Sequence, residues 1–372
     1  MHVLVTTDTL SSVWTQTQEL VTGLVNRGVR VTLVSFGDIP LSRQISWMEK
    51  LPHLDYHPTA FRLDWMQEGQ HDLEESSRYL TALASEIHPD LLHLSHLCHG
   101  SLPVEIPRVV TANGDLLTWW LAVHDREPKP SRWLDWYREE IARGVSEASV
   151  VVASSSWMLE AVQECYAEPR CTAVLPVGRN PILFNPYVSK NDYVLAIGRL
   201  LDPGRQTSLL TQYVHPMPVC IINADDRPAM LESPICTGVK VDLEAANISL
   251  KGAQTEAQLR ILYSRAPIFV AAARYEPLGL SVLEAALSRC AIVANDVPCF
   301  REVWGDAAIY FEANNAESLA DVIRRLHEER DLCRGYGARA FQRARERFTA
   351  QRMVHDYLQL YQQALATHAV AA

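Results

Sequence analysis

The feature that most constrains the fold of this chain is a series of short, largely apolar runs, each followed by a segment with helical periodicity. In the first half the runs are HVLVTT, VRVTLVSF, LLHLSH, RVVTAN and SVVVAS. Runs of this kind are typical of strands buried on both faces. The rhythm starts again at Tyr193 with YVLAIG, VCIINAD, ISLKG, PIFVAAA and AIVANDV. The pattern predicts an α/β fold with two open, mostly parallel sheets.

The chain of 372 residues is long enough for two domains. The passage PVGRNPILFNPYVSKND, from Pro176 to Asp192, reads as the linker, and we expect the boundary near Pro186. Residues 1–186 would form the first domain and residues 187–349 the second. We expect residues 350–372, which contain MVHDYLQLYQQAL, to form a helix that packs back on the first domain. Open parallel sheets bind ligands at the carboxyl ends of their strands, which predicts two such rims facing a cleft.

Composition excludes several classes of protein. A formal charge of −10 argues against a nucleic acid as the main partner, because that would need a basic face. The eight cysteines show no close pair at zinc or redox spacing, which favours reduced thiols. Met1 leads directly into a strand-like run, and no apolar run approaches the ~20 residues that span a bilayer. We therefore expect a cytoplasmic protein without a transmembrane segment.

The stretch from Pro267 to Asp296 carries the most chemical information and reads strand, loop, helix, strand. The first backbone N–H groups of a helix have no partner within the helix. These donors and the helix dipole together attract anions. We therefore expect Gly279, Leu280 and Ser281 to bind a diphosphate.

Two glutamates, Glu276 and Glu284, lie on either side of this expected phosphate site. Carboxylates repel phosphate, but they accept two hydrogen bonds from a vicinal diol, which favours sugar and ribose hydroxyls as their ligands. The alternative is structural, with one glutamate complementing the helix dipole and the other solvated in the next turn.

A second segment, YVLAIGRLLDPGRQTSLL, places Arg199 just beyond a strand and Arg205 six residues later. Guanidinium groups at these positions suit a pyrophosphate that gains negative charge as it leaves. Taken alone, the segment is equally consistent with two arginines on a surface loop.

Together these segments resemble the retaining glycosyltransferases of family four, whose GT-B fold has two facing Rossmann-like domains. The likeness covers nearly the whole chain and is carried by the Gly-Arg-Leu strand end, RYEPLGLSVLEAALS and REVWGDAAIYF. It implies that Glu276 contacts the donor sugar and Glu284 the ribose. It also implies that Arg199 and Arg205 hold the diphosphate with residues 279–281, with Arg205 where lysine is usual. Such enzymes need no metal.

The resemblance implies transfer of a hexose from a nucleoside diphosphate sugar to an acceptor hydroxyl, with the anomeric configuration retained. The backbone at Lys251, Gly252 and Ala253 would read the base, and UDP-, GDP- and ADP-sugars all remain open, as do the acceptor and the oligomeric state. Two alternatives also remain: a sugar-nucleotide-binding protein of this fold with weak or no catalysis, and an epimerase or phosphorylase. A nicotinamide dehydrogenase is disfavoured because neither opening strand is followed by G-x-G-x-x-G.

The first half resembles the family less closely. Ser11 and Ser12 stand where the family usually has two glycines, whose missing side chains allow close backbone approach. Asn113 stands where a histidine commonly faces the donor sugar, so a neutral amide replaces a protonatable group. These departures motivate the alternative of weak catalysis. Trp119 and Trp120 would stack on an acceptor sugar or pack in the core.

The run HLSHLCHG contains His93, His96, Cys98 and His99. A metal site is disfavoured here, because a strand leading into a loop does not hold ligands at three-residue spacing on one side. His99 matches a family position beside the cleft. It would either donate or accept a hydrogen bond with a sugar or phosphate, or be a satisfied structural histidine.

Overall fold

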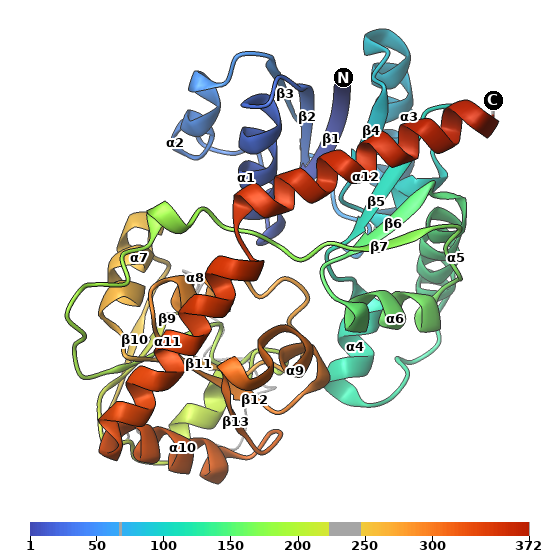
Figure 1. Ribbon diagram of the computed structural model, residues 1–372. Coiled ribbons are helices and arrows are strands. Elements are labelled where there is room, and N and C mark those ends of the chain that lie inside the picture. The colour runs from blue at the N-terminus through green and yellow to red at the C-terminus, as the bar shows by residue number, and fades with distance from the viewer. Residues whose placement is uncertain (67–68, 223–246, 372) are drawn as a thin grey trace. The chain divides into compact units, whose positions relative to one another are not determined.

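The structure, a computed structural model, describes residues 1–66, 69–222 and 247–371. The chain divides into two compact units, one comprising Met1–Gly178 with Ala350–Ala372 and the other Arg179–Thr349. Each unit contains one parallel sheet with helices packed against it (Figure 1), which confirms the predicted α/β class. The division falls before Arg179 rather than near Pro186. The reason is that the Arg179 side chain binds carboxylates of the second unit, as described below.

The sheet of the first unit has seven strands among the described residues, in the order β3-β2-β1-β4-β5-β6-β7. All neighbouring pairs are parallel. The strands are β1 His2–Asp8, β2 Arg30–Phe36, β3 Leu54–Pro58, β4 Leu91–Leu94, β5 Arg108–Ala112, β6 Val150–Ala153 and β7 Thr172–Val174. The inner strands β4 and β6 are buried along their whole length, which explains why their sequences do not alternate.

Helices cover both faces of this sheet. They are α1 Val13–Val25, α2 Ser42–Ile45, α3 Gly69–Ile87, α4 Leu116–His124, α5 Arg132–Glu147, α6 Ser156–Cys165 and α12 Ala350–Ala371, with short 3₁₀ helices η1 Ser46–Lys50 and η2 Leu97–Ser101. Helix α12 belongs to the first unit although it follows the second unit in the chain. It lies beside α1 (Figure 1). Its buried residues, among them Val354, Tyr357 and Tyr361, share one core with β1, β2 and β4.

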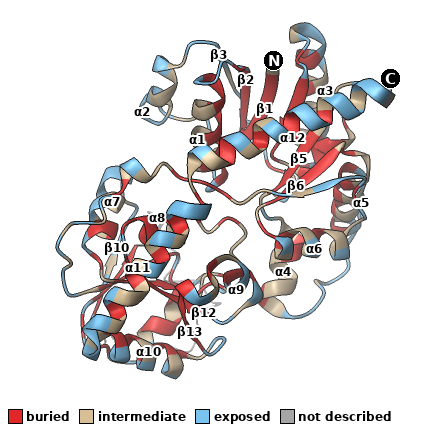
Figure 2. Cartoon of the chain, viewed as in Figure 1, coloured by how far each residue is buried: buried red, intermediate tan, exposed pale blue. Residues whose placement is uncertain are grey.

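The sheet of the second unit has six strands among the described residues, all parallel, in the order β10-β9-β8-β11-β12-β13. They are β8 Val194–Ile197, β9 Val219–Ile222, β10 Ile248–Lys251, β11 Ile268–Ala271, β12 Ala291–Asn295 and β13 Ile309–Phe311. Its helices are α7 Glu256–Arg265, α8 Leu280–Leu287, α9 Pro298–Trp304, α10 Ala316–Glu328 and α11 Arg330–Arg347, with η3 Pro181–Leu183, η4 Thr207–Thr211 and η7 Gly305–Ala307. Figure 2 shows burial concentrated on the strands and on one side of the helices in each unit.

The seven cysteines among the described residues are all free thiols; Cys236 lies outside the described residues. None of the described helices is both long enough and apolar enough to cross a membrane.

Candidate active site

The carboxyl ends of β8 and β11, which are neighbours in the second sheet, bring Arg205 and Glu276 together. The guanidinium of Arg205 forms an ion pair with the Glu276 carboxylate, and the charge of Glu276 raises the pKa of Arg205. The Glu276 side chain is only 8% exposed and that of Arg205 is 38% exposed. Both line a pocket of about 240 Å³ that also contacts Ser281. Arg205, Glu276 and Ser281 therefore converge in one place, although 71 residues separate the ion pair along the chain.

The two loops that carry this pair are tied together by the backbone. The N–H of Arg274 donates to the carbonyl of Gly204, with 2.9 Å between N and O. Asp202 shapes the first loop, because its Oδ1 accepts hydrogen bonds from the N–H groups of Gly204 and Arg205 at 2.8 and 3.3 Å. The geometry of Arg205 is thus fixed by its neighbours before any ligand binds.

The start of α8 is a tight turn around Gly279. Gly279 is its N-cap with φ of +64°, a left-handed conformation that glycine adopts without strain. The helix begins at Leu280, whose side chain is buried in the core. The Gly279 N–H donates to Oε1 of Glu276 at 3.1 Å. Glu276 therefore occupies, in this structure, two donors that the sequence assigns to a diphosphate: the Gly279 amide and the Arg205 guanidinium.

Arg199 lies apart from this pocket lining. Its side chain is 52% exposed and its guanidinium lies 3.4 Å from Oδ2 of Asp202, three residues further along. The Arg199 carbonyl accepts a hydrogen bond from Thr207 Oγ1 at 3.0 Å. The backbone of Arg199 is therefore anchored, while its half-exposed side chain pairs with Asp202.

Glu284 is not solvated, so the structural alternative of a solvated glutamate is wrong. Its side chain is 12% exposed, and Oε1 lies 2.9 Å from Nε of Arg179. The same guanidinium donates from Nη2 to Oε1 of Glu256, the first residue of α7, at 2.8 Å. Burial raises the pKa of Glu284, whereas the charge of Arg179 lowers it. Arg179 thus holds the expected ribose ligand, a role that the sequence analysis missed.

Lys251, Gly252 and Ala253 follow at the end of β10 and are exposed. The carbonyls of Gly252 and Ala253 lie 3.0 and 3.3 Å from the Gln254 amide nitrogen. Thr255, two residues after Ala253, caps α7 through its hydroxyl. These residues lie at the carboxyl edge of the second sheet, where open parallel sheets bind ligands, and their contact with the base stays a prediction.

In the first unit, Ser11 and Ser12 form the turn between β1 and α1. Ser11 Oγ donates to Oδ2 of Asp8 at 2.8 Å and accepts from the Val13 N–H at 3.1 Å. Ser12 is the N-cap residue of α1 and is exposed. The Ser11 hydroxyl is therefore part of the turn itself. Asn113, after β5, donates from Nδ2 to Thr111 Oγ1 at 2.8 Å.

Two histidines of the run HLSHLCHG, His93 and His99, are buried in different places. His93 is buried in β4 with Nδ1 2.5 Å from the Tyr361 hydroxyl of α12. His99 is buried in η2 with Nε2 3.1 Å from Ser76 Oγ. No three His, Cys, Asp or Glu side chains in the described ranges are grouped to hold a metal ion.

Trp119 and Trp120 are half-buried on α4. Their ring centroids lie 6.3 Å apart, and both rings also contact His124. They form an aromatic cluster among themselves, so both earlier interpretations, sugar stacking and core packing, remain predictions.

Comparisons with known proteins find a glycosyltransferase family model in each unit. Residues 13–181 match the model described as Glycosyltransferase Family 4, and residues 242–343 match the one described as Glycosyl transferases group 1. A curated relative, the alpha-maltose-1-phosphate synthase of Mycolicibacterium smegmatis, is 32% identical over 117 residues, which are 29% of this chain and 30% of the relative. The similarity to curated relatives thus spans about a third of their length.

The fold is shared over almost the whole chain with solved structures. The sucrose-phosphate synthase of Thermosynechococcus elongatus aligns with a TM-score of 0.79 and 14% identity, covering 99% of this chain and 100% of that one. HepE of Anabaena in complex with UDP-glucose aligns with a TM-score of 0.73 and 14% identity, covering 99% and 100%. With one family match in each unit and this shared two-unit fold, the chain belongs to the family-four type of glycosyltransferase with the GT-B fold.

Proposed function

We propose that this protein transfers a hexose from a nucleoside diphosphate sugar to an acceptor hydroxyl and retains the anomeric configuration. The observation that carries the proposal is the Arg205–Glu276 ion pair at the start of α8, in a chain of this family. The fold shared with HepE, which was solved with UDP-glucose, supports a nucleotide sugar as the donor. We place the enzyme in the cytoplasm.

The ion pair suggests how donor binding proceeds. Arg205 and the Gly279 N–H, both bonded to Glu276 here, are the donors that a diphosphate would take. A diphosphate carries more negative charge than one carboxylate, so it replaces Glu276 at both groups. The released Glu276 then accepts hydrogen bonds from hydroxyls of the donor sugar. In this proposal Glu276 keeps the phosphate donors oriented until the substrate arrives.

Charge on the leaving diphosphate is offset by this chain's own groups. Arg205, the exposed Arg199 and the N–H groups of Gly279, Leu280 and Ser281 are the proposed donors, in place of a metal ion. Glu284, kept near Arg179, is the proposed acceptor for ribose hydroxyls, and residues 251–253 the contact for the base. The leaving phosphate oxygen would take the proton of the acceptor hydroxyl on the same face of the sugar, which retains the configuration.

The test combines binding and transfer. UDP, GDP and ADP, each with EDTA, are titrated calorimetrically, and the sugar of the preferred nucleotide is then offered with a panel of acceptors. Proton NMR of the product reads the anomeric configuration. We expect Arg205→Ala to weaken diphosphate binding and to lower transfer by about 10²–10³-fold. Arg205→Lys, which restores the family's usual residue, should retain much of both.

The matched control is Arg324→Ala, which removes a guanidinium that is 53% exposed and whose ion pair within the described part of the chain is with Asp321, one turn away on α10. It should leave binding and transfer unchanged. Full activity of Arg205→Ala would contradict the proposed phosphate site, and an inverted product would contradict retention.

One observation favours a second candidate, a sugar-nucleotide-binding protein with weak catalysis. The Ser11 hydroxyl is built into the β1–α1 turn, where the family usually has glycine. If this turn limits turnover, the double change Ser11→Gly and Ser12→Gly should raise transfer without altering nucleotide affinity. Tight nucleotide binding with no transfer in either form would support this candidate over the first.

A further inference from the structure

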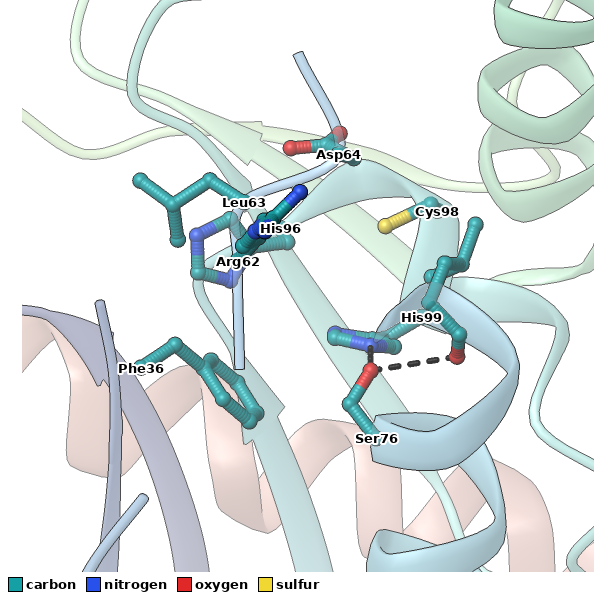
Figure 3. Close-up of a pocket in the computed structure, with 9 residues that line it drawn as sticks. Phe36, Arg62, Leu63, Asp64, Ser76, His96, Cys98 and His99 are labelled. Carbon is teal, nitrogen blue, oxygen red and sulfur yellow. Dashed lines mark hydrogen bonds between the residues drawn. The ribbon is translucent and has the colours of Figure 1, made fainter. Parts of the chain in front are cut away.

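A second pocket lies within the first unit, at the carboxyl ends of β2 and β4. It is lined by Phe36, Arg62, Asp64, Ser76, His96 and His99, among others (Figure 3). Its empty volume is about 220 Å³, including space open to solvent. The enclosed free space is about that of one water molecule, so it suits a single hydroxyl group at one end of a ligand. The proposal for the second unit uses none of these residues.

The hydrogen bonds around His99 determine which of its ring nitrogens carries the proton. Ser76 Oγ donates its single proton to the carbonyl of Leu73 at 3.1 Å. Both bonds can form together only if Oγ accepts from His99 Nε2, 3.1 Å away, so we assign the ring proton to Nε2 (Figure 3). Burial lowers the pKa of His99 to about 3, which leaves only this one ring proton at neutral pH.

The other nitrogen, Nδ1, is consequently an acceptor. The His99 residue is 3% exposed, and its buried Nδ1 has no hydrogen-bond partner among the described residues. A buried polar atom without a partner costs ~1–3 kcal/mol, so the site gains when a ligand supplies a proton. His99 is held in place by aromatic contacts, with centroid distances of 5.4 Å to Phe36 and 5.8 Å to His96.

The lone pair of Nδ1 selects the chemistry of the ligand. A hydroxyl can donate to it, whereas a phosphate dianion or a carboxylate has no proton to give and is repelled. Asp64, half-buried nearby, accepts the Cys98 thiol proton and adds a second acceptor to the pocket. The exposed Arg62 attracts anions to the outside, but only a proton donor satisfies His99.

We propose that this pocket binds a hydroxyl of a neutral sugar or polyol through His99 Nδ1, as the subsite for a carbohydrate acceptor. Its role as an acceptor subsite rests on the proposed transferase function, whereas the binding itself does not. Ser76 acts here as a positioning residue, because it fixes the tautomer without touching the ligand.

The direct test is NMR of the full chain with ¹⁵N-labelled histidine. Without ligand, we expect a pyridine-type Nδ1 and a protonated Nε2 for His99, assigned by comparison with His99→Phe. Titration with D-glucose, trehalose or glycerol should shift the Nδ1 resonance as it accepts a hydrogen bond, while inorganic phosphate should not. The proposal is overturned by a protonated Nδ1 or by a shift with phosphate alone. It is also overturned if no sugar or polyol shifts the Nδ1 resonance, because a buried water would then be the hydrogen-bond donor to Nδ1.

Two serine variants of α3 separate positioning from a general structural effect. Ser76→Ala removes the acceptor that fixes the tautomer, so we expect mixed tautomers and about fivefold to tenfold weaker sugar binding. Ser85→Ala is the control, because the Ser85 hydroxyl is exposed and donates to the Thr81 carbonyl on the same helix, at 2.9 Å. Equal sugar affinity in both variants would contradict the role of Ser76. Arg205→Ala should leave sugar binding intact, which keeps this test separate from that of the donor site.

Discussion

The guanidinium of Arg179 is 2% exposed and serves two carboxylates, Glu256 and Glu284. A buried charge of this kind is stable only while its partners remain, since removing one leaves the other buried without compensation. The Glu256 carboxylate also accepts from Arg260, one turn along α7. Burial raises the pKa of Glu284, and the charge of Arg179 opposes this by lowering it.

Arg179→Met should therefore destabilise the protein by about 3 kcal/mol, because Glu284 is left buried without its cation. The double change Arg179→Met with Glu284→Gln should recover part of that loss. Arg260→Met, which removes a partly exposed partner of Glu256, should cost no more than about 1 kcal/mol. Urea unfolding measures all three, and equal losses for Arg179→Met and Arg260→Met would contradict this account.

A second residue-scale effect is acid sensitivity from buried histidines. Burial lowers the pKa of His93 to about 4, against ~6.5 for an unfolded chain. Below pH 6.5 the unfolded chain therefore binds more protons than the folded one, and stability falls as the pH drops towards 4. We expect this histidine to contribute a loss on the order of 3 kcal/mol.

The measurement is urea unfolding at pH 7.0, 5.5 and 4.5 for the parent chain and His93→Asn. The variant lacks the titrating group, so its stability should fall less steeply between pH 6.5 and 4.5. Parallel pH profiles for the two proteins would show that His93 is not responsible. His99, whose pKa burial lowers to about 3, acts in the same direction and is present in both proteins.

At the scale of elements, the packing of α12 on α1 depends on Gly23. A Cβ atom at this position would come within 2.4 Å of Cγ2 of Val354. Gly23→Ala should therefore destabilise the first unit by ~1–3 kcal/mol through overpacking, despite the higher helix propensity of alanine. Adding Val354→Ala should relieve the clash, so the double mutant should be more stable than the sum of the two single changes predicts. Thermal unfolding of the four proteins measures this coupling, and simple additivity would contradict it.

The strands also show how far the sequence can be interpreted without a structure. Inner strands such as β4, β6 and β11 are buried throughout and are visible as apolar runs. The edge strands β3, β7 and β13 were not predicted. β3 and β7 are largely exposed or half-exposed, and β13 is only three residues long, so none carries a strong apolar signal.

Some contacts of the candidate site could also be predicted from the sequence, whereas others could not. Glu276, Gly279 and Ser281 lie within one strand-loop-helix segment, so their proximity follows from local sequence. Arg179 and its partner Glu256 are 77 residues apart, and no local pattern links them. The hydrogen bond that assigns the tautomer of His99 comes from Ser76, 23 residues away on another element. It could not be predicted from the local sequence either.

At the scale of the molecule, the second unit is one continuous stretch inserted into the first. Its two ends adjoin each other, because the Arg179 N–H donates to the Phe348 carbonyl at 3.1 Å and Arg179 forms a parallel bridge with Thr349. A unit with adjacent ends and its own core resembles an independent domain.

Residues 179–349 expressed alone should therefore fold and, given the proposed function, bind a nucleoside diphosphate. At a ligand concentration 100 times Kd, stabilisation of ~2.7 kcal/mol should raise Tm by several degrees. The same fragment with Arg205→Ala should melt at a similar temperature without ligand but respond less to it. Differential scanning fluorimetry with UDP, GDP and ADP tests this, and an unfolded fragment would contradict the claim of independence.

The position of α12 reverses the order in which the two units are completed during synthesis. All residues of the second unit leave the ribosome before Ala350, whereas His93 in β4 meets Tyr361 only after another 268 residues have been added. Until then, the apolar face that α12 covers has no partner from the same unit. The half of the molecule translated first is the half that finishes folding last, and its nascent form is the one most in need of a chaperone.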